Sequence, residues 1–227
     1  MRVLLVGGGV TNSLVSYFVR HVNGIRLTCW EKARGVGGRF ATKRTSHGER
    51  VDHGAQYLTR YMSTKEHDEI YGSLIENGII RPFSMDQVDQ AHPKSLDKEH
   101  FVATTGTSSI PKHFFGVNGA VDLKTGLFLK RLEMKNGEVE AETRCGLVES
   151  FDYVLVSIPA PQLLDDVEVT LSAQLKEKLA QVSYSSRYAL IKYFTGTVDL
   201  DHVDAAMVSN AVGYRYEISV SSALLPC

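Results

Sequence analysis

Residues 3–31 are VLLVGGGVTNSLVSYFVRHVNGIRLTCWE. The apolar run Val3–Val6 is typical of a buried parallel strand, and it passes at once into three glycines at 7–9. Asn23-Gly24 supplies a helix stop, and Ile25–Trp30 is rich in strand-forming residues. Between them, apolar residues recur at helical spacing: Leu14, Val15, Phe18, Val19 and Val22. The order of strand, glycine turn, helix and strand predicts a right-handed βαβ unit.

The glycine turn carries a dinucleotide-binding pattern. Gly7 and Gly9 stand where such a fingerprint needs a tight turn and a close approach of the backbone to a pyrophosphate, while Asn12 replaces the third glycine. Glu31 lies at the end of the second strand, where a carboxylate accepts hydrogen bonds from ribose hydroxyls. The pattern predicts a bound nucleotide without a 2′-phosphate. The alternative is a βαβ turn that binds no phosphate, with a solvated Glu31.

A second glycine motif, Gly37-Gly38-Arg39, follows Glu31 by six residues. Glycines let the backbone pass close to a cofactor, and the forked guanidinium of arginine can bridge two phosphates. At this distance from the acid, the motif resembles the extended flavin signature of the amine oxidase and glutathione reductase-like families.

The resemblance becomes specific at Asp52-His53-Gly54-Ala55-Gln56-Tyr57, which is similar to the renalase family, small FAD-dependent flavoproteins related to amine oxidases. It continues in order from residue 2 to about residue 220, through 101–103, 108–110, 158–161 and 183–190. Proteins of this family run about half as long again, so we expect the chain to lack their C-terminal third.

The resemblance implies roles for particular residues. Thr11 would offer its backbone N–H to the pyrophosphate, and Arg39 would contact the phosphates or the ribityl chain. Gln56 and Tyr57 would lie near the flavin, and Leu127 would present its backbone to the adenine. Tyr57 is also the candidate catalytic residue, with a structural role as the alternative.

We therefore predict an α/β fold, a Rossmann-like FAD-binding domain interleaved with an antiparallel-sheet substrate domain, as in glutathione reductase or p-hydroxybenzoate hydroxylase. Residues 1–80 and 115–165 would form the first domain, 81–114 and 166–220 part of the second, and 221–227 an irregular tail. The flavin ring would meet substrate at the seam between them.

Other patterns predict local elements. A helix is expected from about Lys65 to Gly78, with Ile70, Leu74 and Ile75 inward, and Asn136-Gly137 signals a hairpin. Strands are expected at 153–158, 184–194 and 212–220, and residues 31–61 are expected to form a long loop. A further amphipathic helix is marked by four apolar residues: Leu171, Leu175, Leu179 and Val182.

Composition narrows the partners of this chain of 227 residues. Its net charge of −1 gives no basic surface for nucleic acid or an anionic membrane, and no apolar run approaches the ~20 residues of a membrane helix. Cys29, Cys145 and Cys227 form no CxxC pair, which suits a reducing, cytoplasmic location, with secretion left open. His47 and His53 lack a third ligand at zinc spacing, so no metal site is expected.

The predicted function is that of an FAD-dependent oxidase. The resemblance implies hydride transfer from isomeric dihydronicotinamide dinucleotides to FAD and then to O2, which yields hydrogen peroxide; monoamines are the alternative substrates. Two other functions stay open: an inactive, truncated form that binds FAD weakly or not at all, and an NAD-dependent dehydrogenase, against which Gly37-Gly38-Arg39 argues.

Overall fold

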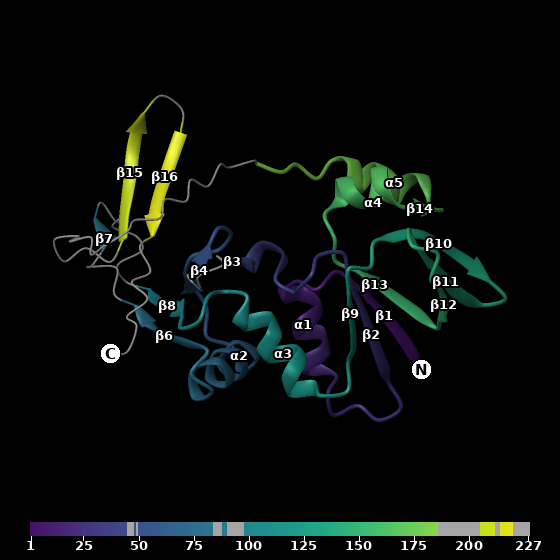
Figure 1. Ribbon diagram of the computed structural model, residues 1–227, viewed down its shortest axis with the longest axis horizontal. Helices are drawn as coiled ribbons and strands as arrows, with labels where there is room; N and C mark the ends of the chain where they lie inside the picture. The colour runs from purple at the N-terminus through teal and green to yellow at the C-terminus, as the bar shows by residue number, and fades with distance from the viewer. Residues whose placement is uncertain are drawn as a thin grey trace. The chain divides into compact units, whose positions relative to one another are not determined.

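The computed structural model describes residues 1–44, 48, 50–83, 88–89, 98–185, 205–211 and 214–219 (Figure 1). It contains two compact units. Unit 1 comprises Met1–Arg39 and Pro111–Tyr188, and unit 2 comprises Phe40–Ile110 and Ala189–Cys227. These units group residues by contact, whereas the division proposed from the sequence is functional, so the FAD-binding and substrate domains stay a prediction.

The centre of unit 1 is a parallel sheet of four strands. Their order is β13 (Tyr153–Val156), β1 (Arg2–Val6), β2 (Arg26–Glu31) and β9 (Asp122–Thr125). Helix α1 (Val10–Phe18) connects β1 to β2. The predicted βαβ unit is therefore confirmed, and the sheet edge at the carboxyl ends of β1 and β2 carries both the glycine turn and Glu31.

A second sheet in unit 1 is mainly antiparallel. Strands β10 (Leu129–Lys135), β11 (Glu138–Thr143) and β12 (Val148–Phe151) form a meander, and the short β14 (Glu168–Val169) pairs with β10 in parallel. Asn136 and Gly137 connect β10 to β11 with φ angles of 52° and 83°. These left-handed conformations are those of a tight two-residue turn, which confirms the predicted hairpin.

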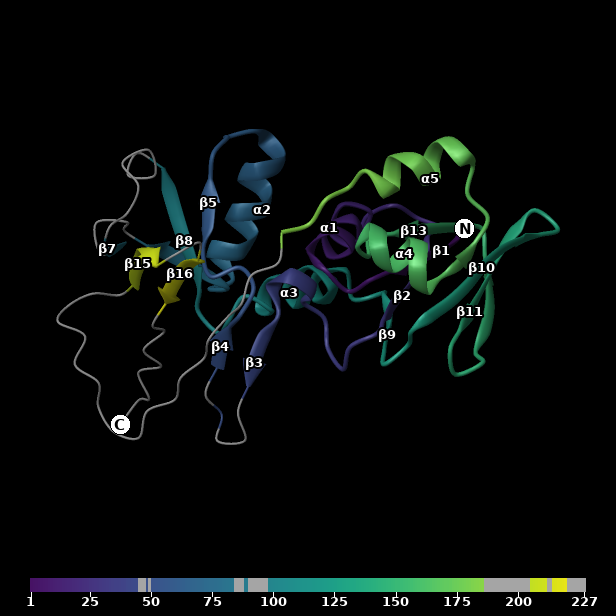
Figure 2. The same ribbon diagram turned by 90° about the horizontal axis from the view of Figure 1, so that it is seen from above.

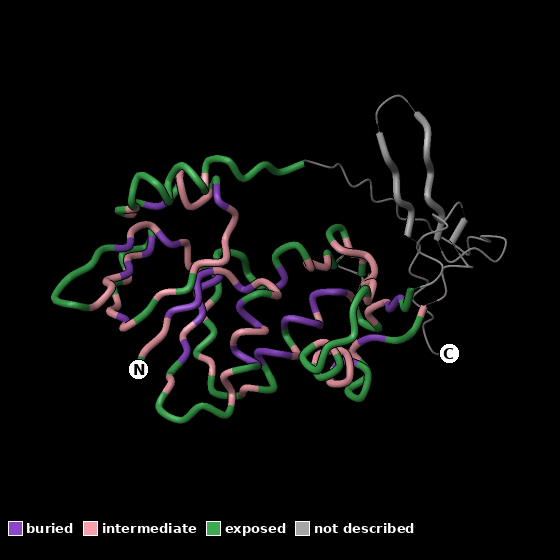
Figure 3. Tube along the Cα trace, turned by 180° about the vertical axis from the view of Figure 1, so that it is seen from behind, coloured by how far each residue is buried: buried purple, intermediate pink, exposed green. Residues whose placement is uncertain are grey.

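In unit 1 the parallel sheet lies between the meander and helices α1 and α3 (Ser109–Asn118) (Figures 1 and 2). Alternate residues of each strand face opposite sides, so Leu4 and Trp30 pack toward the meander, while Leu5 and Cys29 pack toward the helical side. The Trp30 ring meets the Phe151 ring edge-on at 5.9 Å. Figure 3 shows β1 turning from half-buried to buried as the chain leaves the N-terminus.

The buried face of α1 differs from the predicted one. The apolar spacing placed Phe18 and Val22 inward, but they are 43% and 53% exposed. The residues fully buried in α1 are instead mostly small and polar: Asn12, Ser13, Ser16 and Tyr17. Helix α3 (Ser109–Asn118) approaches this face closely, since Asn118 Nδ2 donates to the Ser16 carbonyl at 2.7 Å. Small side chains permit that approach, and an apolar periodicity does not reveal it.

The remaining helices of unit 1 follow β13. Helix α4 (Ala160–Asp166) comes first, and α5 (Ala173–Ala180) confirms the helix expected near residues 171–182. The leucines of α5 are not buried in this unit: α5 has no buried residue, and Leu175 is 44% exposed.

Unit 2 contains short strands within the segment expected to be a loop. A 3-10 helix (Gly38–Phe40) straddles the start of this unit and leads to the hairpin of β3 (Thr42–Arg44) and β4 (Arg50–Asp52). The prediction of one long loop is therefore wrong in part: short strands held by tertiary contacts carry too few residues to show a periodicity.

The rest of unit 2 pairs strands that are distant in sequence. Strand β8 (Glu99–Ala103) lies between β5 (Leu58–Arg60) and β6 (Ile80–Phe83). Strands β7 (Val88–Asp89), β15 (Ala205–Ala211) and β16 (Tyr214–Ser219) form another sheet, and β16 confirms most of the strand expected at 212–220.

Helix α2 (Lys65–Glu76) confirms the predicted helix of unit 2. Thr64 caps its N-terminus by accepting from the His67 N–H, and Gly78 follows its end at φ 64°. Leu74 is buried as expected, whereas Ile75 is 42% exposed, which corrects its inward assignment. The strand expected at 184–194 lies outside the described residues beyond Ser185, as does the tail 221–227.

Candidate nucleotide-binding site

The two glycine motifs meet in unit 1. The Gly37 N–H donates to the Gly8 carbonyl at 2.9 Å, and Gly9 and Gly37 form an isolated parallel bridge. A Cβ on Gly38 would lie 3.5 Å from the Cα of Gly9. The second motif is thus folded against the first at the carboxyl end of β1.

The three glycines of the first motif differ in conformation and surroundings. Gly7 has φ 101°, a conformation that favours glycine, and its N–H donates to the Trp30 carbonyl at 2.8 Å. A Cβ on Gly8 would lie only 2.7 Å from Val36 Cγ1. A Cβ on Gly9 would meet nothing within 4 Å. The backbone at Gly7 and the packing at Gly8 require glycine, whereas Gly9 borders open space.

Helix α1 begins beside that open space. Gly9 is its N-cap, and the bond from the Ser13 N–H to the Gly9 carbonyl, at 3.1 Å, opens the helical ladder. The amides before Ser13, including that of the exposed Thr11, therefore have no acceptor within the helix. The first turn carries no acidic residue. Open space, amide donors and the positive end of the helix dipole together fit a pyrophosphate.

Glu31 is tied into the site by backbone donors. Its side chain is buried, with Oε2 accepting from the Gly8 N–H at 2.6 Å and Oε1 accepting from the Ala33 N–H at 2.7 Å. The alternative of a solvated carboxylate is therefore wrong. Each carboxylate oxygen retains further acceptor capacity, so the predicted contact with ribose hydroxyls is compatible with these two bonds.

Asn12 supports the glycine turn, a role that the sequence pattern did not reveal. Its side chain is fully buried, and Nδ2 donates to the Val6 carbonyl at 3.0 Å and to the Gly7 carbonyl at 2.8 Å. Where the fingerprint expects a glycine, an amide therefore holds the end of β1. The one sign of this role in the sequence was that an asparagine amide can donate two hydrogen bonds.

Arg39 and Leu127 complete the part of the site in unit 1. Arg39 is exposed, directly after the Gly37–Gly38 segment. Leu127 lies beside the end of β2, since its N–H donates to the Glu31 carbonyl at 3.0 Å. Because that N–H is already used, the Leu127 carbonyl is the backbone group left for an adenine. Both roles remain predictions.

Gln56 and Tyr57 belong to unit 2, and their predicted place near the flavin stays a prediction. Both are half-buried. The Tyr57 ring meets the His100 ring edge-on at 5.8 Å, and His100 Nδ1 in turn shares a hydrogen bond of 3.0 Å with Thr59 Oγ1. These contacts give the Tyr57 ring a defined packing partner, as the structural alternative requires.

Cys29 lies under the glycine turn but is not a nucleophile. Burial raises the pKa of its thiol to about 12, and the neighbouring Glu31 carboxylate acts in the same direction. The thiol is therefore protonated at neutral pH.

Within the described ranges, no three His, Cys, Asp or Glu side chains gather in a way that could hold a metal ion. Nor does any helix there have the length and apolar character to cross a membrane.

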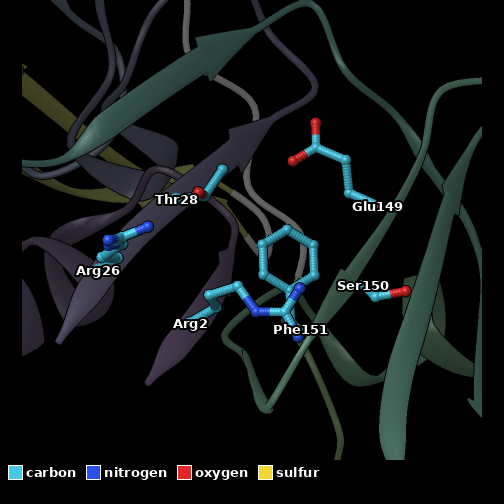
Figure 4. Close-up of a pocket in the computed structure, with 6 residues that line it drawn as sticks. All are labelled: Arg2, Arg26, Thr28, Glu149, Ser150 and Phe151. Atoms are coloured by element: carbon cyan, nitrogen blue, oxygen red, sulfur yellow. The ribbon is translucent and has the colours of Figure 1, made fainter. Parts of the chain in front are cut away.

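A separate cavity of about 310 Å³ opens at the other end of the parallel sheet (Figure 4). The residues that line it include Arg2 and Arg26, at the amino ends of β1 and β2, and Glu149 of β12. Arg2 already pairs with Asp152, and Glu149 with Lys124. Nucleotides bind at the carboxyl ends of parallel strands, so this cavity is not the predicted nucleotide site.

The parallel sheet, glycine turn and terminal carboxylate define a Rossmann-like fold of the kind that dinucleotide-binding domains share. In agreement, a family model described as an NAD(P)-binding Rossmann-like domain matches residues 5–74. The chain is similar to the renalase of Mus musculus, with 37% identity over 200 residues, which are 83% of this chain and 57% of that protein. The resemblance predicted from the motifs is confirmed.

A solved structure supports the fold. The chain is similar to a proposed protoporphyrinogen oxidase from Exiguobacterium sp. 255-15, with a TM-score of 0.54 and 15% identity. The match covers 73% of this chain and 61% of that chain. The predicted fold class is confirmed.

Proposed function

We propose that this protein binds FAD and acts as a flavin-dependent oxidoreductase. The observation that carries the proposal is the joining of the two glycine motifs over the N-terminus of α1, at a sheet edge where Glu31 is held in place. Homology to renalase supports the same cofactor class. The chain spans 57% of the length of that relative, so the catalytic activity is proposed here together with the cofactor.

The residues present fit the nucleotide part of the cofactor. The Thr11 amide and the space in front of Gly9 would receive the pyrophosphate, and Arg39 would neutralise its charge. Glu31 would accept from the ribose hydroxyls, and the Leu127 carbonyl would face the adenine. Gln56 and Tyr57 would contact the flavin ring, with Tyr57 as the candidate catalytic residue.

The substrate class that we propose is a dihydronicotinamide dinucleotide of isomeric ring reduction, with an amine as the alternative. A bound flavin would supply the redox chemistry, in which a hydride equivalent passes from the substrate and, with one proton, reduces O2 to hydrogen peroxide. The protein's own part is to bind the dinucleotide and to orient it. We place the reaction at the predicted seam between the FAD-binding and substrate domains, and the protein in the cytoplasm.

The test combines cofactor binding with turnover. The purified chain is incubated with FAD, freed of unbound cofactor and scanned between 350 and 500 nm; a flavin spectrum is expected. Peroxide is then measured with isomeric dihydronicotinamide dinucleotides, with ordinary NADH and with a monoamine. Absence of any flavin binding would overturn the proposal.

The match to an NAD(P)-binding model favours one second candidate, an NAD-dependent dehydrogenase. Titration with NAD⁺ distinguishes the two, because the dehydrogenase would bind NAD⁺ and retain no flavin. Flavin binding without turnover of any of these substrates would favour the remaining alternative, a catalytically inactive form.

A further inference from the structure

An aromatic residue lies next to the proposed ribose position. Residues 126–128 run alongside residues 31–33, since the Gly126 N–H donates to the Ala33 carbonyl and the Leu127 N–H to the Glu31 carbonyl, each at 3.0 Å. Phe128 follows directly and is half-buried. In an adenine nucleotide the base is attached to the ribose, so the surroundings of Phe128 lie within reach of a base whose ribose binds Glu31.

Arg144 packs over that aromatic ring. Its guanidinium carbon lies 3.7 Å from the centroid of the Phe128 ring, and the backbone N–H of Arg144 donates to the Phe128 carbonyl at 2.9 Å. Nη2 also pairs with Asp166 Oδ1 at 3.2 Å. A guanidinium is planar and has two faces. The Arg144 side chain lies against Phe128 and is still 53% exposed, so part of the guanidinium remains available to a ligand.

A second cation adds to the positive charge at this place. Lys32 Nζ lies 5.6 Å from the centroid of the same Phe128 ring. The nearby carboxylate of Glu31 is already engaged by two backbone N–H groups. The combination attracts a polyanionic nucleotide, and planar guanidinium groups stack on nucleobases.

We propose that Arg144, backed by Phe128 and held by Asp166, is a positioning residue that stacks on the adenine of the bound nucleotide. The inference rests on the proposed function and adds a residue to it. Any cation could attract the phosphates, whereas stacking on the adenine needs a planar group such as the guanidinium of Arg144.

The test uses the full 227-residue chain and a matched control. Arg20 makes the same kind of stack, with its guanidinium carbon 3.7 Å from the Tyr17 ring centroid, but it follows the C-terminal end of α1. Wild type, Arg144→Ala, Arg144→Lys and Arg20→Ala are titrated with FAD, with ADP and with FMN, which lacks adenine. Urea midpoints verify that each variant is folded.

Arg144→Ala is expected to weaken FAD and ADP binding about 5- to 100-fold, the range of stacking on one base. Arg144→Lys should recover only part of the loss, while FMN binding and the Arg20→Ala variant stay at the wild-type level. Phe128→Leu should resemble Arg144→Ala, and Phe128→Tyr should resemble wild type.

Three results would overturn the inference. If Arg144→Ala binds FAD and ADP like wild type, Arg144 has no role and the proposed function stands. If Arg144→Lys binds fully, charge and not a stacking face is what matters. If wild type binds neither FAD nor ADP, the proposed function fails and the inference falls with it.

Discussion

The Gly37 N–H donates to the Gly8 carbonyl at 2.9 Å and thereby joins glycine motifs that lie on either side of strand β2. This one bond fixes how far the second motif stands from the N-terminus of α1. The bond brings Gly38 beside Gly9, and Arg39 follows Gly38 directly in the chain. Both motifs therefore border the space that we propose for the phosphates.

Gly8 and Gly9 are expected to respond differently to the same substitution. Gly9→Ala places a methyl group where no atom lies within 4 Å, so stability should change by less than about 1 kcal/mol, the weaker N-cap being offset by a less flexible unfolded chain. FAD binding should nevertheless weaken, by about tenfold or more, because the methyl group enters the phosphate space. Urea unfolding and FAD titration measure the two effects.

Gly8→Ala is the matched comparison. Its Cβ would lie 2.7 Å from Val36 Cγ1 and 3.1 Å from Glu31 Oε2, so the variant should lose about 1–3 kcal/mol of stability. An equal loss of stability in both variants would contradict the assignment of the open space to a ligand.

Arg39→Ala is expected to weaken FAD retention by about 1.5–3 kcal/mol, because a charge-assisted contact with phosphate is lost. Arg34 is exposed on the same connection, so Arg34→Ala serves as the control and should bind FAD like wild type. Titration of the cofactor-free protein measures both. Equal dissociation constants for Arg39→Ala and wild type would mean that Arg39 is only a surface charge.

Glu31→Ala should reduce both stability and FAD binding. The buried Gly8 N–H would lose its acceptor, at a cost of about 1–3 kcal/mol, and the ribose would lose its partner. Glu31→Gln keeps one oxygen and should do less harm. Glu138→Ala, which removes a carboxylate from an exposed pair with Arg2, is the control and should cost at most about 1 kcal/mol. An unaltered urea midpoint in Glu31→Ala would disprove the role of the carboxylate in the turn.

Asn12→Gly restores the glycine of the fingerprint but is expected to destabilise the protein. It removes two hydrogen bonds to the Val6 and Gly7 carbonyls, each worth about 1 kcal/mol, and glycine costs about 1 kcal/mol more within a helix. Asn12→Asp should be at least as harmful, since a carboxylate would face two carbonyl oxygens. Urea unfolding tests both, and an Asn12→Gly variant as stable as wild type would contradict the argument.

The βαβ unit, the hairpin and the nucleotide pattern followed from the sequence because each is local. Strand periodicity, Asn136-Gly137 and the spacing from Gly9 to Glu31 involve neighbours along the chain, so their physics is present in short segments. The resemblance to renalase extended this local information along most of the chain.

Only the tertiary structure showed how these local pieces interact. In the sequence Asn12 is only a missing glycine, but in the structure its side chain donates to the end of β1. Glu31 could have been solvated, but it is buried and accepts from Gly8 and Ala33. The stack of Arg144 on Phe128 joins a turn of the meander to the end of the parallel sheet. Such hydrogen bonds and stacks form between residues distant in sequence, so their partners are fixed by the packing of strands and helices and leave no local pattern.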